Sequence, residues 1–205
     1  MSRGSEQPGM SLRERKQLRA REAIVEAAHE LFAERGFDHV TVADIAARAE
    51  VGRATFFRYF GDKQEVVFAD SGRDLEAALA AVESKPGTES LGRSLPEVLV
   101  FMRTLVLAFV AQLVQRPVEY REYERLIAEQ PELHARSLVK QRGYIDRMVE
   151  ELSAKGVERE VATLAAEIGM ACYFAGRAMA DNDPRRLPDA IRNAFDQLGV
   201  GPDLA

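Results

Sequence analysis

The chain has 205 residues, of which 46% are hydrophobic and 30% charged, and its net charge is −5. This composition excludes a disordered or membrane-embedded protein, and the single cysteine, Cys172, excludes an intramolecular disulfide and fits a reducing cytoplasm. Helix-forming residues dominate and alternating β-branched segments are absent, so we expect an all-α fold.

The N-terminal region differs in charge from the rest. Residues 1–11 are polar and contain glycine and proline, which predicts a flexible arm. They lack the apolar segment of a signal peptide, so we expect no export and a cytoplasmic location. Residues 1–21 hold six basic and two acidic side chains, whereas residues 64–205 hold 17 basic and 23 acidic ones. This asymmetry suits a DNA-facing end joined to an acidic body.

The next segment reads as a brace helix followed by two short helices. Apolar residues recur at helical spacing from Leu12 until Gly36, which ends the pattern. Thr41 then sits at an N-cap position, Val51-Gly52 makes a tight turn, and a second short helix runs from Arg53 to Phe60. Two short helices joined in this way are typical of a helix-turn-helix, whose second helix enters the major groove of DNA.

The run ELFAERGFDHVTVADIAARAEVGRATFFRYFGDKQEVV resembles the N-terminal domain of the TetR family of bacterial transcriptional repressors. The resemblance covers about the first third of the chain, from near Arg15 to Phe68, and rests on the motifs LFAERGF, TVADIA, VGRATFFRYF and DK. Glu50 and Gly52 depart from the family pattern, since such proteins often have Gly and Ser there. The resemblance implies a homodimer bound to a palindromic operator of double-stranded DNA.

The resemblance also implies which side chains meet DNA. Thr41 and Lys63 would contact phosphates, and the dipole of the helix that Lys63 begins would assist it. Arg53 would stand at the start of the recognition helix, where arginine suits bidentate contact with guanine. We therefore predict these DNA-binding residues: Thr41, Arg53, Ala54, Thr55, Phe57, Arg58, Tyr59 and Lys63.

The C-terminal part is predicted to be a helical bundle. One long helix should run from Lys63 to about Val82, followed by a loop over residues 84–94. Proline and glycine then divide the chain into helices at residues 95–116, 117–130, 131–156, 157–180 and 187–198. The domains expected are a flexible arm (1–11), a three-helix helix-turn-helix domain (12–65) and a ligand-binding and dimerisation domain (66–205).

Two of these helices are apolar on more than one side. Residues 98–114 contain Arg103 and fall short of the roughly 20 apolar residues of a bilayer span, so we expect a buried helix and no membrane partner. Residues 157–180 carry Cys172 on one apolar face and Tyr173 on the other. The resemblance implies that this helix and the last one form the dimer interface, and the sequence leaves open which face meets the partner.

The interior of the bundle is the default ligand site. We predict a small hydrophobic or amphipathic ligand, with Arg177 as the partner of an anionic group, although the same residue types are also typical of an ordinary core. The candidate ligand-binding residues are Phe101, Leu105, Phe109, Tyr123, Tyr144, Met148, Met170, Tyr173, Phe174 and Arg177.

The function predicted is therefore that of a TetR-like repressor released from its operator by a small molecule. The alternative is a helix-turn-helix regulator without a small-molecule ligand, controlled by a partner or by its abundance. We do not expect an enzyme, a cofactor or a metal site, because the three histidines are isolated and the chain lacks metal-ligand spacing, a nucleophile elbow and a phosphate-binding glycine loop.

Overall fold

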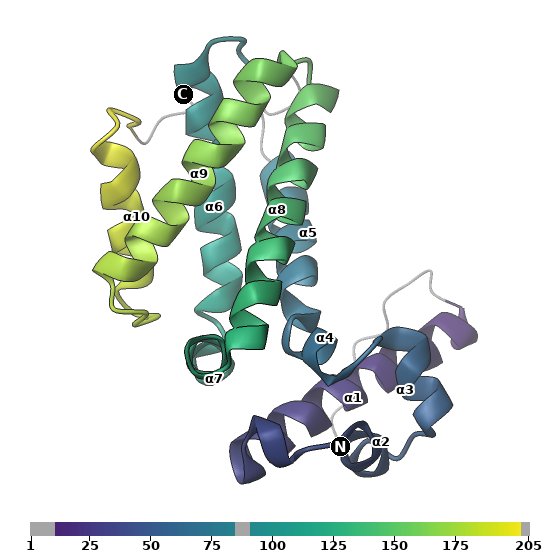
Figure 1. Cartoon of the computed structure of the whole chain (residues 1–205). Helices are drawn as coiled ribbons and strands as arrows, with labels where there is room; N and C mark the ends of the chain where they lie inside the picture. Colours follow the sequence, from purple (N-terminus) through teal and green to yellow (C-terminus); the bar gives the residue numbers. More distant parts are fainter. Residues whose placement is uncertain (1–10, 85–90, 202–205) are drawn as a thin grey trace, which may run out of the picture. The chain divides into compact units, whose positions relative to one another are not determined.

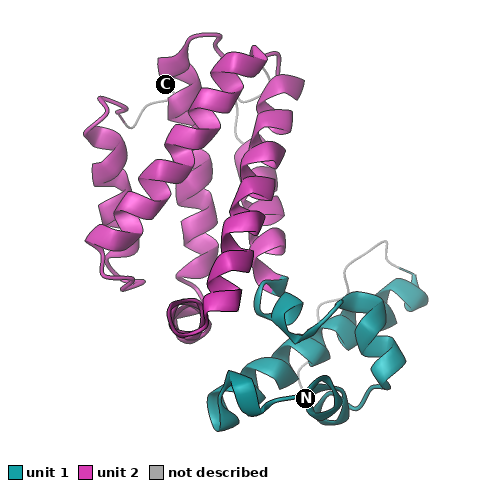
Figure 2. Cartoon of the chain, viewed as in Figure 1, with its two compact units in different colours: residues 1–69 teal, residues 70–205 magenta. Residues whose placement is uncertain are grey.

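A computed structural model of the chain describes residues 11–84 and 91–201. Within these two ranges it contains helices and no strand, so the predicted all-α class is confirmed (Figure 1). The chain folds as two compact units, residues 1–69 and 70–205 (Figure 2). Residues 1–10 of the predicted arm and residues 85–90 of the predicted loop lie outside the described residues.

The first unit is built around α1 (Leu12–Arg35). This helix packs against three short helices: α2 (Val42–Arg48), α3 (Arg53–Tyr59) and α4 (Lys63–Val67). Gly36 ends α1 at a φ of +78°, a conformation that favours glycine, and a 3-10 turn, η1 (Phe37–His39), leads to α2. The brace and the two short helices therefore form where the local sequence predicts them.

The single long helix predicted from Lys63 to Val82 is wrong. α4 ends at Val67, and α5 (Ala69–Glu83) begins after a turn at Phe68. The Phe68 side chain is buried, its N–H bonds back to Glu65 and Val66, and Arg21 of α1 donates a hydrogen bond of 2.7 Å to the Ala69 carbonyl. These tertiary contacts interrupt a helix that the local pattern would continue.

α9 (Arg159–Met179) is the central helix of the second unit. It packs against α6 (Leu95–Leu113), α8 (Pro131–Ala154) and α10 (Leu187–Asp196), while α7 (Pro117–Glu129) packs against α8. Two glycines bring the helices close together. A Cβ on Gly169 would lie 2.6 Å from Cε of Met102 on α6, and one on Gly176 would lie 2.9 Å from Cα of Ile191 on α10.

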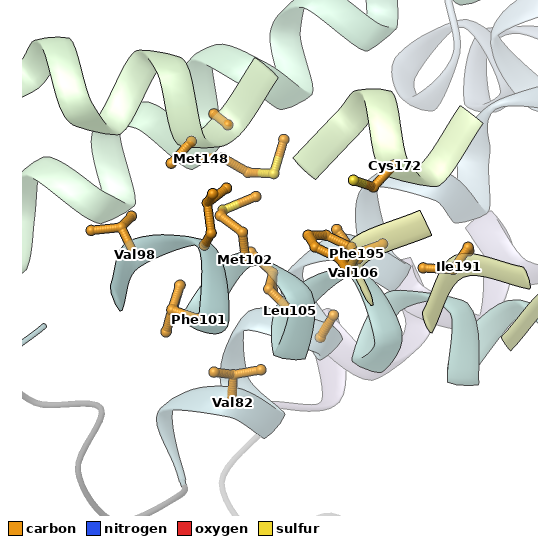
Figure 3. Packing of buried hydrophobic residues seen from close by; sticks show 14 of the residues in the cluster. Val82, Val98, Phe101, Met102, Leu105, Val106, Met148, Cys172, Ile191 and Phe195 are labelled. Atoms are coloured by element: carbon orange, nitrogen blue, oxygen red, sulfur yellow. The ribbon is translucent and has the colours of Figure 1, made fainter. Parts of the chain in front are cut away.

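α6 is the core helix of this unit. Its 19 residues are long and apolar enough to cross a membrane by length and composition alone. Val98, Phe101, Met102 and Leu105 are nevertheless fully buried among side chains of the neighbouring helices (Figure 3). The burial confirms the predicted core helix.

Candidate functional site

The helix-turn-helix is formed by α2 and α3. Thr41 caps α2, since its Oγ1 accepts from the Asp44 N–H at 3.2 Å while its own N–H donates to Asp44 Oδ2 at 2.9 Å. Glu50 in the turn has a φ of +53°, and Gly52 caps α3 without any side-chain hydrogen bond. These are the two positions that depart from the family pattern. Glu50 is a non-glycine residue with a left-handed backbone conformation, and Gly52 is a helix cap that has no side chain to accept a hydrogen bond.

α3 separates an inner from an outer face. Phe56 and Phe60 are buried against the unit, whereas the Phe57 side chain is 54% exposed. Arg53, Ala54 and Arg58 are also exposed, and Thr55 and Tyr59 are half-buried. The Arg58 guanidinium lies 5.1 Å from the centre of the Tyr59 ring. Arg53, Phe57 and Arg58 thus form one exposed basic and aromatic surface, whereas the Tyr59 hydroxyl is buried.

The two predicted phosphate-binding residues are already engaged inside the unit. The Thr41 hydroxyl donates to Asp44 Oδ2 at 2.5 Å, and this bond lowers the pKa of Asp44. Lys63 Nζ donates to the carbonyls of Phe37 at 2.8 Å and Val40 at 3.1 Å, and lies 4.2 Å from the centre of the Phe37 ring. Lys63 therefore ties the start of α4 to the turn that follows α1.

A second polar clamp fixes α2 against α1. Arg48 of α2 donates to Glu30 and Glu34 of α1, each at 2.9 Å. These bonds lower the pKa of Glu34, with the hydrogen bond from Arg48 as the largest cause. The clamp holds the helix that precedes the recognition helix, and it joins residues too far apart in sequence to be found from helical spacing.

The ten candidate ligand-binding residues fall into two groups. Phe101, Leu105 and Met148 are fully buried in the hydrophobic core (Figure 3). The remaining seven are only partly buried: Phe109, Tyr123, Tyr144, Met170, Tyr173, Phe174 and Arg177. Within this second group the Tyr173 ring lies 5.7 Å from Phe109 and 5.3 Å from Phe174, so side chains of α6 and α9 meet there.

Arg177 is held by a buried carboxylate that the sequence analysis missed. Its Nη2 donates to Glu124 of α7, and its guanidinium lies 5.5 Å from the ring centres of Tyr173 and Phe174. Burial raises the pKa of Glu124, while Arg177 acts in the opposite direction. Glu124 occupies a polar-looking helix, and only its spacing of four residues from Tyr120 could have indicated that both face inward.

α7 also carries a second ion pair, at its first turn. Arg116 donates to Asp74 at 2.6 Å and to Asp70 at 2.7 Å, which lie on α5. Asp74 is buried, and burial raises its pKa although Arg116 counteracts the effect. Arg116, Tyr120 and Glu124 follow one another at four-residue spacing, so one face of α7 connects α5 with α9.

The metal-ligating side chains and Cys172 were also candidates for chemistry. No group of three His, Cys, Asp or Glu side chains is placed to hold a metal ion in residues 11–84 and 91–201. Cys172 is buried, and burial raises the pKa of its thiol, which disfavours the reactive thiolate.

Comparison with known proteins agrees with this geometry. Residues 24–69 match the family model described as bacterial regulatory proteins of the tetR family. The transcriptional regulator TcmR of Streptomyces glaucescens is 43% identical over 82 residues, which are 40% of this chain but only 36% of TcmR. The putative mycofactocin biosynthesis transcriptional regulator MftR of Mycobacterium tuberculosis is 28% identical over 189 residues, 88% of this chain and 89% of MftR.

The fold of the whole chain is also found among solved structures. FadR of Thermus thermophilus, a TetR-family transcriptional repressor solved in complex with lauroyl-CoA, aligns with a TM-score of 0.53 and 23% identity over 90% of this chain and 95% of FadR. At this identity the likeness concerns the fold alone. The matched model thus shows that residues 24–69 form a helix-turn-helix domain of the TetR family, and the proteins to which the whole chain is similar are transcriptional regulators.

Proposed function

We propose that the protein is a cytoplasmic repressor that binds a palindromic operator as a homodimer and is released by a small molecule bound in its second unit. The outer face of α3 carries the DNA-binding part of this proposal. Exposed arginine beside exposed Phe57 provides a charged and apolar surface that fits the phosphates, base edges and thymine methyl groups of the major groove.

Within this surface we assign Arg53 to base recognition, since it is exposed at the first position of α3. Ala54, Thr55, Phe57, Arg58 and Tyr59 would line the groove beside it. The Thr41 hydroxyl already donates to Asp44, and Lys63 uses two of its N–H donors on backbone carbonyls. Both residues would therefore contact phosphates only with donors that these internal hydrogen bonds do not use.

The first experiment is selection of bound DNA from a random pool, followed by affinity measurements on the selected operator and on random DNA. Arg53→Ala should weaken operator binding by about 1–3 kcal/mol and random binding far less. Arg159→Ala, an exposed arginine of the second unit, is the matched control and should change neither affinity. Equal losses on both DNAs would exclude Arg53 as the base-reading residue.

Homodimer formation is supported by the outer face of α9. Leu164, Ala171, Ala175 and Met179 are exposed there, at the spacing of one helical stripe. Gly169 and Gly176, by contrast, are used for packing within the chain. An exposed apolar stripe of mostly small side chains suits close approach of a second copy. Sedimentation that found only monomer at micromolar concentration would contradict this proposal.

Release by a ligand is supported by the second unit's internal contacts. The half-buried aromatic side chains around Arg177 form a surface of the kind that binds small molecules, and FadR of Thermus thermophilus, with the same fold, binds lauroyl-CoA. Arg116 then links α7 to α5, the helix that follows the first unit in sequence. A ligand that binds more tightly to one arrangement of α7 would increase the population of that arrangement. The size of the shift is set by the difference between its affinities for the two arrangements.

Ligand-controlled release from DNA is tested by screening compounds for their ability to release the selected operator, which is measured by fluorescence anisotropy. Compounds that release wild-type protein at concentrations where they bind it support the ligand-gated repressor. If compounds bind the second unit and none changes operator affinity, the regulator without a small-molecule effector is the correct description.

A further inference from the structure

The Glu124–Arg177 ion pair is surrounded by polar atoms that have no partner among the described residues. Glu124 Oε1, Arg177 Nε and the Tyr120 hydroxyl are all buried and make no hydrogen bond. The Tyr120 and Glu124 side chains belong to residues that are only 5% and 8% exposed. A buried polar atom without a partner costs roughly 1–3 kcal/mol, so three of them at one place require an explanation.

These three atoms belong to one group of side chains. Tyr120 and Glu124 lie one turn apart on α7, and Arg177 reaches them from α9. Burial raises the pKa of the Tyr120 hydroxyl, and the Arg177 guanidinium lies near enough to act in the opposite direction. The three side chains therefore meet at one position, where α7 contacts α9.

Aromatic rings surround this position. Four of the chain's five tyrosines (Tyr120, Tyr123, Tyr144 and Tyr173) are neighbours there, and Phe109 and Phe174 pack on Tyr173. Burial raises the pKa of Tyr120, Tyr123 and Tyr173, so these hydroxyls are neutral at physiological pH. Apart from Tyr120, the rings are only half-buried. A flat aromatic molecule could therefore stack on their exposed faces.

The charge balance decides what kind of polar group fits. Glu124 already neutralises Arg177, so a ligand carboxylate would bring an uncompensated negative charge into a buried site or would have to displace Glu124. A purely apolar ligand would leave all three polar atoms unpaired. A neutral group with one donor and one acceptor oxygen pairs two of the three atoms: it donates to Glu124 Oε1 and accepts from Arg177 Nε or from the Tyr120 hydroxyl.

We infer that the ligand of the second unit is an uncharged aromatic compound bearing a phenol hydroxyl or a carboxamide, bound between Glu124, Arg177 and Tyr120. This inference rests on the proposed ligand-binding role of that unit. It replaces the anionic ligand group that the sequence suggested for Arg177, because Glu124 supplies that anion from within the chain.

The test is calorimetric titration of the full chain with matched probes. Phenol, benzamide, 2-naphthol and 2-naphthamide are compared with benzoate and 2-naphthoate. The neutral probes should bind at least about tenfold more tightly than the carboxylate of the same ring system, from the cost of an unpaired buried charge. The inference is overturned if no neutral probe binds, or if the carboxylates bind equally well or better.

Two variants separate a binding role from a structural one. Tyr120→Phe should weaken binding of the neutral probes by about tenfold while its melting temperature stays at or above that of the wild type, since the lost hydroxyl has no partner. Ser153→Ala removes another unpartnered buried hydroxyl, nine residues beyond Tyr144 on α8, and should leave probe binding unchanged. Unchanged probe binding by Tyr120→Phe would refute the site.

Operator release is measured separately. Probes that bind at this site without releasing DNA refute the ligand-gated repressor and leave the site intact. Compounds that release DNA and bind Tyr120→Phe as they bind the wild type refute the site and leave the gate intact.

Discussion

Replacing Lys63 by methionine tests whether this side chain holds the first unit together. The substitution keeps most of the aliphatic stem and removes the ammonium, leaving the Phe37 and Val40 carbonyls without their donor. Two hydrogen bonds from a charged donor and one contact with the Phe37 ring, discounted for partial exposure, are together worth about 2 kcal/mol. For a unit of this size that corresponds to a fall in melting temperature of roughly 8–16 °C.

The assay is urea unfolding followed by circular dichroism, with hydrogen exchange to assign the loss to residues 11–69. Arg53→Met is the matched control, because Arg53 is exposed and its replacement should change stability by less than about 0.5 kcal/mol. The reasoning is refuted if Lys63→Met is as stable as the control. If stability is unchanged while the salt dependence of operator binding falls by about one ion, Lys63 instead acts on a phosphate directly.

Three further predictions concern the turn, the buried carboxylate and the outer face of α9. The double substitution Glu50→Gly with Gly52→Ser should raise the free energy of unfolding by about 0.5–1 kcal/mol. The first change removes a non-glycine residue from the left-handed region, and the second adds a capping side chain where a Cβ meets no atom within 4 Å. Chemical denaturation that showed no gain in stability would contradict this. Burial raises the folded pKa of Glu124 above its ordinary value near 4.5, so its stabilising contribution is full below that value and is lost as pH rises through the folded pKa. As the pH rises from about 4, the melting temperature of the wild type should therefore fall relative to that of Glu124→Gln. A difference in melting temperature that stayed constant or grew in favour of the wild type would show that the pKa of the Glu124 carboxyl is not raised. Leu164→Asp should convert a dimer to monomer in sedimentation without lowering helicity, because Leu164 is exposed in the single chain; a dimer that persists would place the interface elsewhere.

Thr41 and Lys63 can each have two roles, contact with a DNA phosphate and a hydrogen bond within the first unit. The family resemblance assigns both to phosphates, while the structure uses their donors on Asp44 and on two carbonyls within the unit. Both roles depend on the same place in the fold, the starts of α2 and α4. A loss of DNA binding on mutation of either residue is therefore informative only when stability is measured beside it.

The local sequence determined most of the first unit. Thr41 and Gly36 mark helix ends by capping and by a left-handed conformation, and the four-residue spacing of Phe56 and Phe60 indicates which face of α3 is buried. These signals act over a few residues, so they can be read without knowing the rest of the chain. Proline did the same at the starts of α7 and α8.

Tertiary structure alone decided the break at Phe68, the division of the candidate ligand residues and the partner of Arg177. The Arg21 side chain that holds the Ala69 carbonyl lies 48 residues away in sequence, and Glu124 lies 53 residues from Arg177. Periodicity shows that Phe101 and Tyr173 lie on apolar faces, but whether a face is fully packed or half-open depends on which helices cover it. Charge pairing across helices has no local signature, and in this protein it is the feature that defines the chemistry of the proposed ligand site.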